Sequence, residues 1–201
     1  MRKSEITSQR NSARSNPLLA IFACAVLTAP LSGGASPVDP ELRQRLKSAI
    51  EDSASFEDKF AATVWLTDMA IRLEKHVPDS GERMMILRYV HEEASRANLH
   101  PELVLAVIDV ESAFDRFAIS VAGARGLMQV MPFWLRELDQ PDANLFDVQT
   151  NLRIGCTILR YYLDMEKGEL TQALARYNGS VGKRWYPELV LGRLSSRWFK
   201  S

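Results

Sequence analysis

A strongly apolar helix that carries a carboxylate near its end constrains this chain most, and it is contained in the run PELVLAVIDVES. Pro101 suits the first helical position, because the N–H that proline lacks has no helical partner there. Residues at i, i+3, i+4 and i+7 share one helix face, and here they are Val104, Val107, Ile108 and Glu111. We therefore predict that Glu111 lies on the buried face of this helix and that Asp109 points away from that face.

The carboxyl group of Glu111 is expected to hold its proton more firmly than an exposed one. Burial disfavours the charged form, and the C-terminal end of a helix carries partial negative charge, so both effects raise its pKa. A protonated carboxylic acid near neutral pH is what the protonation of a glycosidic oxygen requires. On periodicity alone, a structural glutamate that pairs with an arginine or lies along the core edge is the more frequent case.

Residues 1–35 are predicted to be a secretory signal peptide that directs the protein to the periplasm. Four basic residues precede LLAIFACAVL, which is too short to span a membrane, and the small residues GGA follow at 33–35. The alternatives are a retained anchor, if the apolar segment extends through Leu31, and a lipoprotein modified at Cys24. Phe22 and the short run before Cys24 disfavour the lipoprotein.

Without residues 1–35 the chain has 166 residues, with 21 Lys+Arg against 24 Asp+Glu and a formal net charge of −3. That length suits one domain with a substantial core. The acidic balance argues against nucleic acid as a partner, and no basic stripe with interleaved aromatic residues occurs. The remaining cysteine, Cys156, lies on an apolar helical stripe, and we interpret it as a small core residue rather than a nucleophile.

Helical patterns dominate the chain, and no run alternates with period two for long enough to predict a strand, so an all-α fold is expected. Ser80 and Asp147 are the expected N-terminal caps of two of the helices. The helices are expected at about 41–51, 53–77, 80–98, 101–111, from near 126, 147–163, 170–176 and 185–199. The histidines show no metal-ligand spacing such as HExxH, so neither a metal nor a cofactor is expected.

Short motifs follow the first helix in a definite order. They are Glu111-Ser112, Ser120, GARGLMQVMP at 123–132, NLRIG at 151–155, Tyr177-Asn178, and a later pair of Tyr186 and Val190. From about residue 98 to residue 190 the chain resembles the lytic transglycosylases of the SLT-domain family, which cut the glycan strands of bacterial cell wall. Each motif alone is weak, but all of them in order are specific. One departure is YNGS, where many members have alanine and glycine after the asparagine.

The resemblance implies a single lysozyme-like helical domain at residues 98–201, with residues 36–97 as an N-terminal helical extension packed on it. It implies Glu111 as the catalytic residue. The substrate-binding residues that it implies are Ser120, Gly126, Met128, Gln129, Tyr177 and Asn178. In this set the glycine permits a tight loop, Met128 and Tyr177 offer apolar surface to a pyranose ring, and Gln129 offers an amide to the sugar.

The resemblance further implies that the substrate is peptidoglycan. Glu111 donates a proton to the β-1,4 linkage and then takes one from the sugar's own 6-hydroxyl, which closes a 1,6-anhydro ring. The family lacks the second carboxylate of ordinary glycosidases, for which Asp115 is the nearest candidate here. The alternatives are a lysozyme-type hydrolase on the same fold and a wall-binding or assembly factor of a secretion or conjugation apparatus. A cell-envelope assembly partner is therefore a further candidate, and membrane contact is expected only through a retained signal segment.

Overall fold

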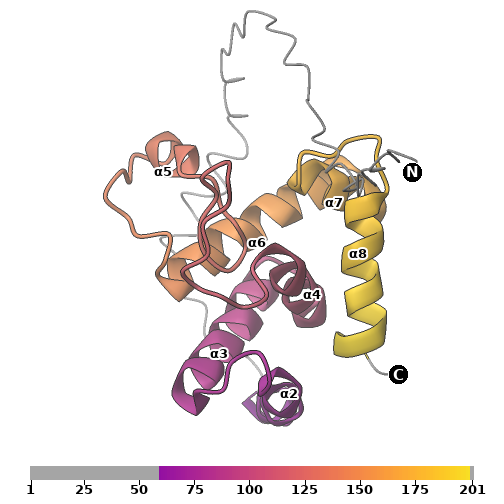
Figure 1. Ribbon diagram of the computed structural model, residues 1–201. Coiled ribbons are helices and arrows are strands. Elements are labelled where there is room, and N and C mark those ends of the chain that lie inside the picture. Colours follow the sequence, from indigo (N-terminus) through magenta and orange to yellow (C-terminus); the bar gives the residue numbers. More distant parts are fainter. Residues whose placement is uncertain (1–58, 200–201) are drawn as a thin grey trace, which may run out of the picture. The chain divides into compact units, whose positions relative to one another are not determined.

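Every regular element in residues 59–199, the part of the chain that this computed structural model describes, is a helix (Figure 1). In chain order they are α2 (Lys59–Leu73), α3 (Ser80–Arg96), α4 (Pro101–Glu111), α5 (Phe133–Glu137), α6 (Val148–Met165), α7 (Leu170–Tyr177), α8 (Trp185–Arg193) and the π-helix η1 (Leu194–Trp198). The prediction of an all-α fold is confirmed. The predicted signal segment and the predicted helix at 41–51 lie outside the described residues, and the division at residue 97 stays a prediction.

Side chains at the helix starts explain where several of these helices begin. Asp147 caps α6 as predicted, and its Oδ1 accepts the N–H of Thr150 at 2.9 Å. The cap of α3 is Asp79 rather than Ser80, because the Asp79 carboxylate accepts the N–H of Glu82 at 2.7 Å. Aspartate and serine are both favoured caps, so neighbouring candidates cannot be separated by residue type alone.

The helix α4 lies at the centre of the described fold and packs against α3, α8 and η1. Its residues from Leu103 to Asp109 are all buried. The prediction of one buried face was therefore too narrow, because neighbours cover this helix on all sides. Asp109, which the periodicity places away from the buried face, is only 7% exposed.

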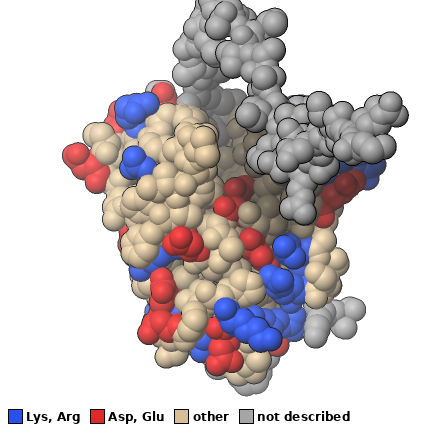
Figure 2. All heavy atoms as spheres, viewed as in Figure 1, with Lys and Arg blue, Asp and Glu red and all other residues tan. Residues whose placement is uncertain are grey.

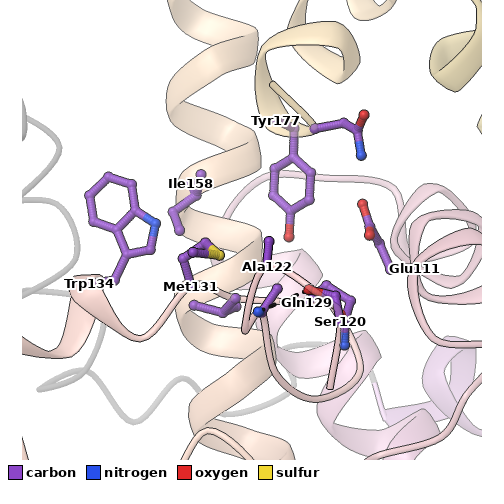
Figure 3. Close-up of a pocket in the computed structure, with 11 residues that line it drawn as sticks. Glu111, Ser120, Ala122, Gln129, Met131, Trp134, Ile158 and Tyr177 are labelled. Atoms are coloured by element: carbon purple, nitrogen blue, oxygen red, sulfur yellow. Dashed lines mark hydrogen bonds between the residues drawn. The ribbon is translucent and has the colours of Figure 1, made fainter. Parts of the chain in front are cut away.

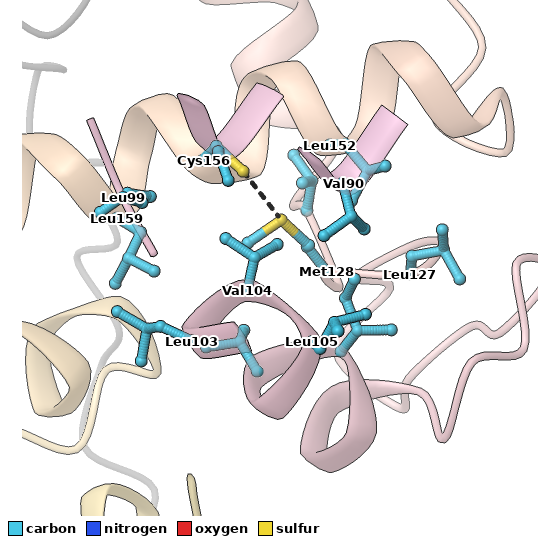
Figure 4. Packing of buried hydrophobic residues seen from close by; sticks show 14 of the residues in the cluster. Val90, Leu99, Leu103, Val104, Leu105, Leu127, Met128, Leu152, Cys156 and Leu159 are labelled. Carbon is cyan, nitrogen blue, oxygen red and sulfur yellow. Dashed lines mark hydrogen bonds between the residues drawn. The ribbon is translucent and has the colours of Figure 1, made fainter. Parts of the chain in front are cut away.

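A continuous hydrophobic core joins α4 to α3 and α6 (Figure 4). In it Val104 of α4, Met128 of the following loop and Cys156 of α6 lie close together. The Cys156 thiol is 3.9 Å from Sδ of Met128. The interpretation of Cys156 as a core residue is confirmed, and burial raises the pKa of its thiol, which disfavours the reactive thiolate.

The predicted helix from near Gly126 is wrong. Gly126 and Gln129 have φ values of 74° and 49°, which no α-helix accommodates, and the helix begins only at Phe133. The side chain of Asn151 on α6 instead holds this loop through three hydrogen bonds. It accepts the N–H of Met128 at 2.8 Å and donates to the carbonyls of Arg125 at 2.8 Å and Leu145 at 2.9 Å.

The C-terminal helix also differs from its expected form. A regular α-helix was expected up to about residue 199, but α8 ends at Arg193 and the π-helix η1 continues to Trp198.

No helix of residues 59–199 is both long enough and apolar enough to cross a membrane. On the face drawn in Figure 2, acidic and basic side chains are interspersed with uncharged ones.

Candidate active site

A pocket of about 270 Å³ opens where the end of α4 meets the following loop and α7. Its lining comprises Glu111, Ser120, Ala122, Ala124, Gln129, Val130, Met131, Trp134, Ile158, Tyr177 and Asn178. In Figure 3, Glu111 and Trp134 lie at opposite sides of this group, with Tyr177 between them. The pocket therefore combines a carboxyl group at one side with apolar and aromatic surface at the other.

Glu111 is the last residue of α4, and its carboxyl group receives a hydrogen bond from α8. The hydroxyl of Tyr186 donates to Oε1 of Glu111 at 2.6 Å. Burial raises the pKa of Glu111, while hydrogen bonds from the side chains of Tyr186 and Asn178 lower it in part. Since burial is the larger effect, the carboxyl group keeps its proton to a higher pH than an ordinary glutamate does.

The backbone turns sharply directly after Glu111. Ala113 and Phe114 both adopt left-handed conformations, with φ values of 49° and 69°. Such conformations cost about 1–2 kcal/mol for each residue that is not glycine. The hydroxyl of Ser112 donates to the carbonyl of Leu127 at 2.8 Å and so joins the helix end to the loop below the pocket. The serine of the Glu-Ser dipeptide thus has a structural role.

Ser120 and Gln129 both line the pocket and also hold its loop together. The Ser120 Oγ accepts the N–H of Ala124 at 3.0 Å, so its own O–H remains available as a donor to a ligand. The amide nitrogen of Gln129 donates to the carbonyls of Ala118 at 3.2 Å and Gly126 at 2.9 Å. For Gln129, the side-chain oxygen is therefore the group that can face a substrate.

Tyr177 and Asn178 stand at the end of α7, on the side of the pocket opposite the loop. The Tyr177 hydroxyl donates to the carbonyl of Met128 at 2.8 Å, and burial raises its pKa well above the usual value. Tyr177 therefore stays protonated and keeps α7 attached to the loop. Asn178 lies beside Glu111, and a hydrogen bond from its side chain lowers the pKa of that carboxyl group.

The structure does not bring Gly126 and Met128 into the pocket lining with the other predicted binding residues. Met128 is fully buried, so its side chain presents no surface to a sugar ring. A Cβ atom on Gly126 would lie 2.5 Å from Nδ2 of Asn151 and from the carbonyl oxygen of Leu145. Both residues thus allow close packing beneath the pocket.

Tyr186 is the residue whose importance the sequence did not reveal. Its pairing with Val190 belongs to the motifs of the sequence, but nothing near it in sequence indicates a contact with a glutamate 75 residues earlier. Asp115, the candidate second carboxylate, does not line the pocket. Its Oδ1 instead accepts the N–H of Phe117 at 2.8 Å.

Within residues 59–199, no group of three or more histidine, cysteine or acidic side chains is arranged to hold a metal ion.

Comparison with known proteins places this pocket in a recognisable domain. The family described as the transglycosylase SLT domain matches residues 88–187. The chain is 34% identical over 112 residues to "Membrane-bound lytic murein transglycosylase C" of Actinobacillus pleuropneumoniae serotype 5b (strain L20), an alignment that covers 48% of this chain and 31% of that protein. It is also 34% identical over 90 residues to the "Transglycosylase" of Enterobacteria phage PRD1, covering 45% and 33% of the two chains.

A third relative is "Membrane-bound lytic murein transglycosylase C" of Yersinia pestis (strain Pestoides F), which is 31% identical over 112 residues, covering 48% of this chain and 31% of that protein. The chain spans about a third of the length of these curated relatives. The region matched by the family runs from within α3 to within α8 and contains both Glu111 and Tyr186. Residues 88–187 of this chain are therefore a transglycosylase SLT domain, a helical domain of the lysozyme-like fold.

Proposed function

We propose that this protein is a peptidoglycan lytic transglycosylase that cleaves the β-1,4 bond between N-acetylmuramic acid and N-acetylglucosamine. The observation that carries the proposal is the state of Glu111. Among the described residues that line the pocket it is the only carboxylate, and burial raises its pKa. One protonated carboxyl group suits a reaction in which the same residue serves first as the acid and then as the base.

In the proposed reaction Glu111 donates its proton to the oxygen that leaves from C1 of the muramic acid. The N-acetyl group of that sugar stabilises C1 as an oxazolinium. The 6-hydroxyl oxygen of the same sugar then attacks C1, and its proton passes to Glu111, which is restored to its starting state. No water enters the product, whose new end is 1,6-anhydro-N-acetylmuramic acid.

The pocket lining supports roles for other side chains in this scheme. The hydroxyl of Ser120 is free to donate to the N-acetyl group next to the scissile bond. Trp134 and Tyr177 supply aromatic surface for sugar rings, and the side-chain oxygen of Gln129 accepts from a sugar hydroxyl. Met128 and Gly126 act beneath the pocket, where they keep its loop in place.

The names of the relatives support a place of action in the cell envelope, since two of them are described as membrane-bound. We propose that this protein acts in the periplasm on glycan strands. Nucleic acid is not expected as a partner, and a secretion or conjugation apparatus is a candidate assembly partner.

Digestion of purified cell wall, with mass spectrometry of the products, tests the proposal. We expect ends that are one water lighter than hydrolytic ends and that borohydride does not reduce. The intramolecular hydroxyl should outcompete water, because well-oriented intramolecular groups reach effective concentrations of about 10⁵ M or more. Reducing ends as the main product would instead indicate a lysozyme-type hydrolase. No product from the wild-type protein, together with retained glycan binding, would indicate a wall-binding factor.

A further inference from the structure

The C-terminal segment of residues 193–198 contacts α4 directly beside the catalytic end. It surrounds the buried carboxylate of Asp109, which lies two residues before Glu111. Nη1 of Arg197 donates to Oδ2 and Oδ1 of Asp109 at 2.9 Å and 3.2 Å. Nε1 of Trp198 donates to Oδ2 at 3.0 Å, and Nε of Arg193 lies 3.6 Å from Oδ1. Three side chains of one segment thus hold one carboxylate of α4.

The same segment holds the sharp turn that follows Glu111. The ring of Trp198 lies 5.3 Å from the ring of Phe114, measured between centroids, and the ring of His76 lies 5.7 Å from it. Phe114 is buried and has a positive φ of 69°, a conformation that needs support from its surroundings. Trp198 therefore contacts α4 before Glu111 and the turn after it.

The helix α2 in turn holds the C-terminal segment. Nη1 of Arg72 donates to the carbonyl oxygens of Arg197 at 3.1 Å and Trp198 at 3.3 Å, which lie at the end of η1. Asp68 binds Arg72 on the same helix, with 2.6 Å between Arg72 Nη2 and Asp68 Oδ2. Nη1 of Arg197 also lies 3.0 Å from Nε2 of His76. Residues 193–198 are thus held by α4 on one side and by α2 and His76 on the other.

We propose that residues 193–198 position the catalytic acid, acting through Asp109 and Phe114 on either side of Glu111. This inference rests on the proposed function. Glu111 is the last residue of α4, so the direction of its side chain depends on the final helical turn and the left-handed turn after it. Tyr186 belongs to α8, which leads directly into the segment. A displaced segment therefore changes how Glu111 and Tyr186 meet.

Two matched tryptophan variants test the proposal. Trp198→Phe keeps an aromatic ring and the charge of the protein, but it removes the N–H that binds Asp109. Trp65→Phe removes the same kind of contact at the other end of α4, where Nε1 donates to Oε1 of Glu102 at 2.8 Å. Both variants lose one hydrogen bond to a carboxylate of α4, and only the first lies near Glu111.

We expect Trp198→Phe to lower kcat on soluble glycan strands by about tenfold, with KM changed less than about twofold, because a misplacement of about 1 Å can cost about 10²-fold. Hydrogen exchange of the backbone amides at 110–115 should become faster in this variant. Trp65→Phe should change neither kcat nor exchange at 110–115. Equal effects of the two variants on kcat, or no effect of Trp198→Phe, would overturn the inference.

A second matched pair covers the case in which Trp198→Phe does not fold. Asp109→Asn removes a buried carboxylate held by Arg193 and Arg197. Glu93→Gln removes a buried carboxylate held by Arg96 and Arg153, between α3 and α6. Faster exchange at 110–115 in the first variant alone supports the inference, and equal exchange overturns it. A wild-type protein without activity overturns the proposed function, and the exchange comparison still decides whether the segment holds the end of α4.

Discussion

The hydroxyl of Tyr186 donates a hydrogen bond of 2.6 Å to the carboxyl group of Glu111 and so connects α8 to the C-terminal end of α4. Burial raises the pKa of Tyr186 well above its usual value, so this hydroxyl keeps its proton and remains a donor. A donated hydrogen bond favours the charged form of a carboxyl group. The hydrogen bond from Tyr186 therefore offsets part of the increase that burial causes in the pKa of Glu111.

Tyr186→Phe should move the alkaline limb of the pH–rate profile to higher pH. The acid must be protonated to act, so the rate falls as pH rises through the pKa of Glu111. Loss of the Tyr186 donor removes an effect that lowers this pKa. The measurement is kcat/KM against pH on soluble glycan strands, with Tyr162→Phe on α6 as the control. A limb that moves to lower pH would show that Tyr186 does not stabilise the carboxylate.

Glu111→Gln should abolish turnover and leave the fold intact. The amide has the size of the carboxyl group but cannot transfer the proton, and general acid–base assistance is worth about 10²–10⁴-fold. The rate of product release measures the loss, while circular dichroism and glycan binding check the fold and the pocket. Turnover close to that of the wild type would identify another residue as the acid.

The stability of the wild-type protein and that of the Glu111→Gln variant should also depend differently on pH. Because the pKa of Glu111 is raised in the folded state, its contribution to stability is complete below the unfolded pKa and is lost as pH rises through the folded pKa. Glutamine does not titrate. The Tm of Glu111→Gln relative to wild type should therefore increase with pH and level off above the folded pKa. A difference in Tm that stays constant with pH would mean that burial does not raise the pKa of Glu111.

Two glycines of the pocket loop should respond differently to alanine. Both have positive φ, 74° at Gly126 and 86° at Gly123, so each substitution costs about 1–2 kcal/mol in backbone strain. A Cβ on Gly123 meets nothing within 4 Å, whereas one on Gly126 would overlap Asn151 and Leu145. Gly126→Ala should therefore cost about 1–3 kcal/mol more. Urea denaturation measures the loss of stability in both variants, and equal losses would contradict the close packing of Gly126 against Asn151 and Leu145.

The elements that the sequence predicted well depend on local interactions. The extent of α4 follows from Pro101 and the apolar run after it, and the start of α6 follows from Asp147, which binds a residue three positions away. The loop after Glu111 was harder to predict, since the side chain of Asn151 holds it from more than 20 residues away. The motif indicated that Gly126 and Met128 belong to the site, but not that they lie beneath it.

The contacts of Glu111 and Asp109 likewise could not be predicted from the sequence pattern. Periodicity describes one helix and contains no information about the segments that cover it. The partners of these two carboxyl groups, Tyr186 and Arg197, lie 75 and 88 residues further along the chain. The burial of Asp109 and the role of Tyr186 therefore became visible only in the folded structure.

On the proposed function, the separation of Asp109 and Arg197 also bears on when a newly made chain becomes active. A chain is synthesised from its N-terminus, so Glu111 has been made long before the arginine that helps to hold its helix. The contact between Arg197 and Asp109 cannot form until Arg197 has been made, 88 residues after Asp109. An unfinished chain thus contains Glu111 without the contacts that residues 193–198 make with α4. We therefore expect the proposed activity on cell wall to appear only after most of the chain has been synthesised.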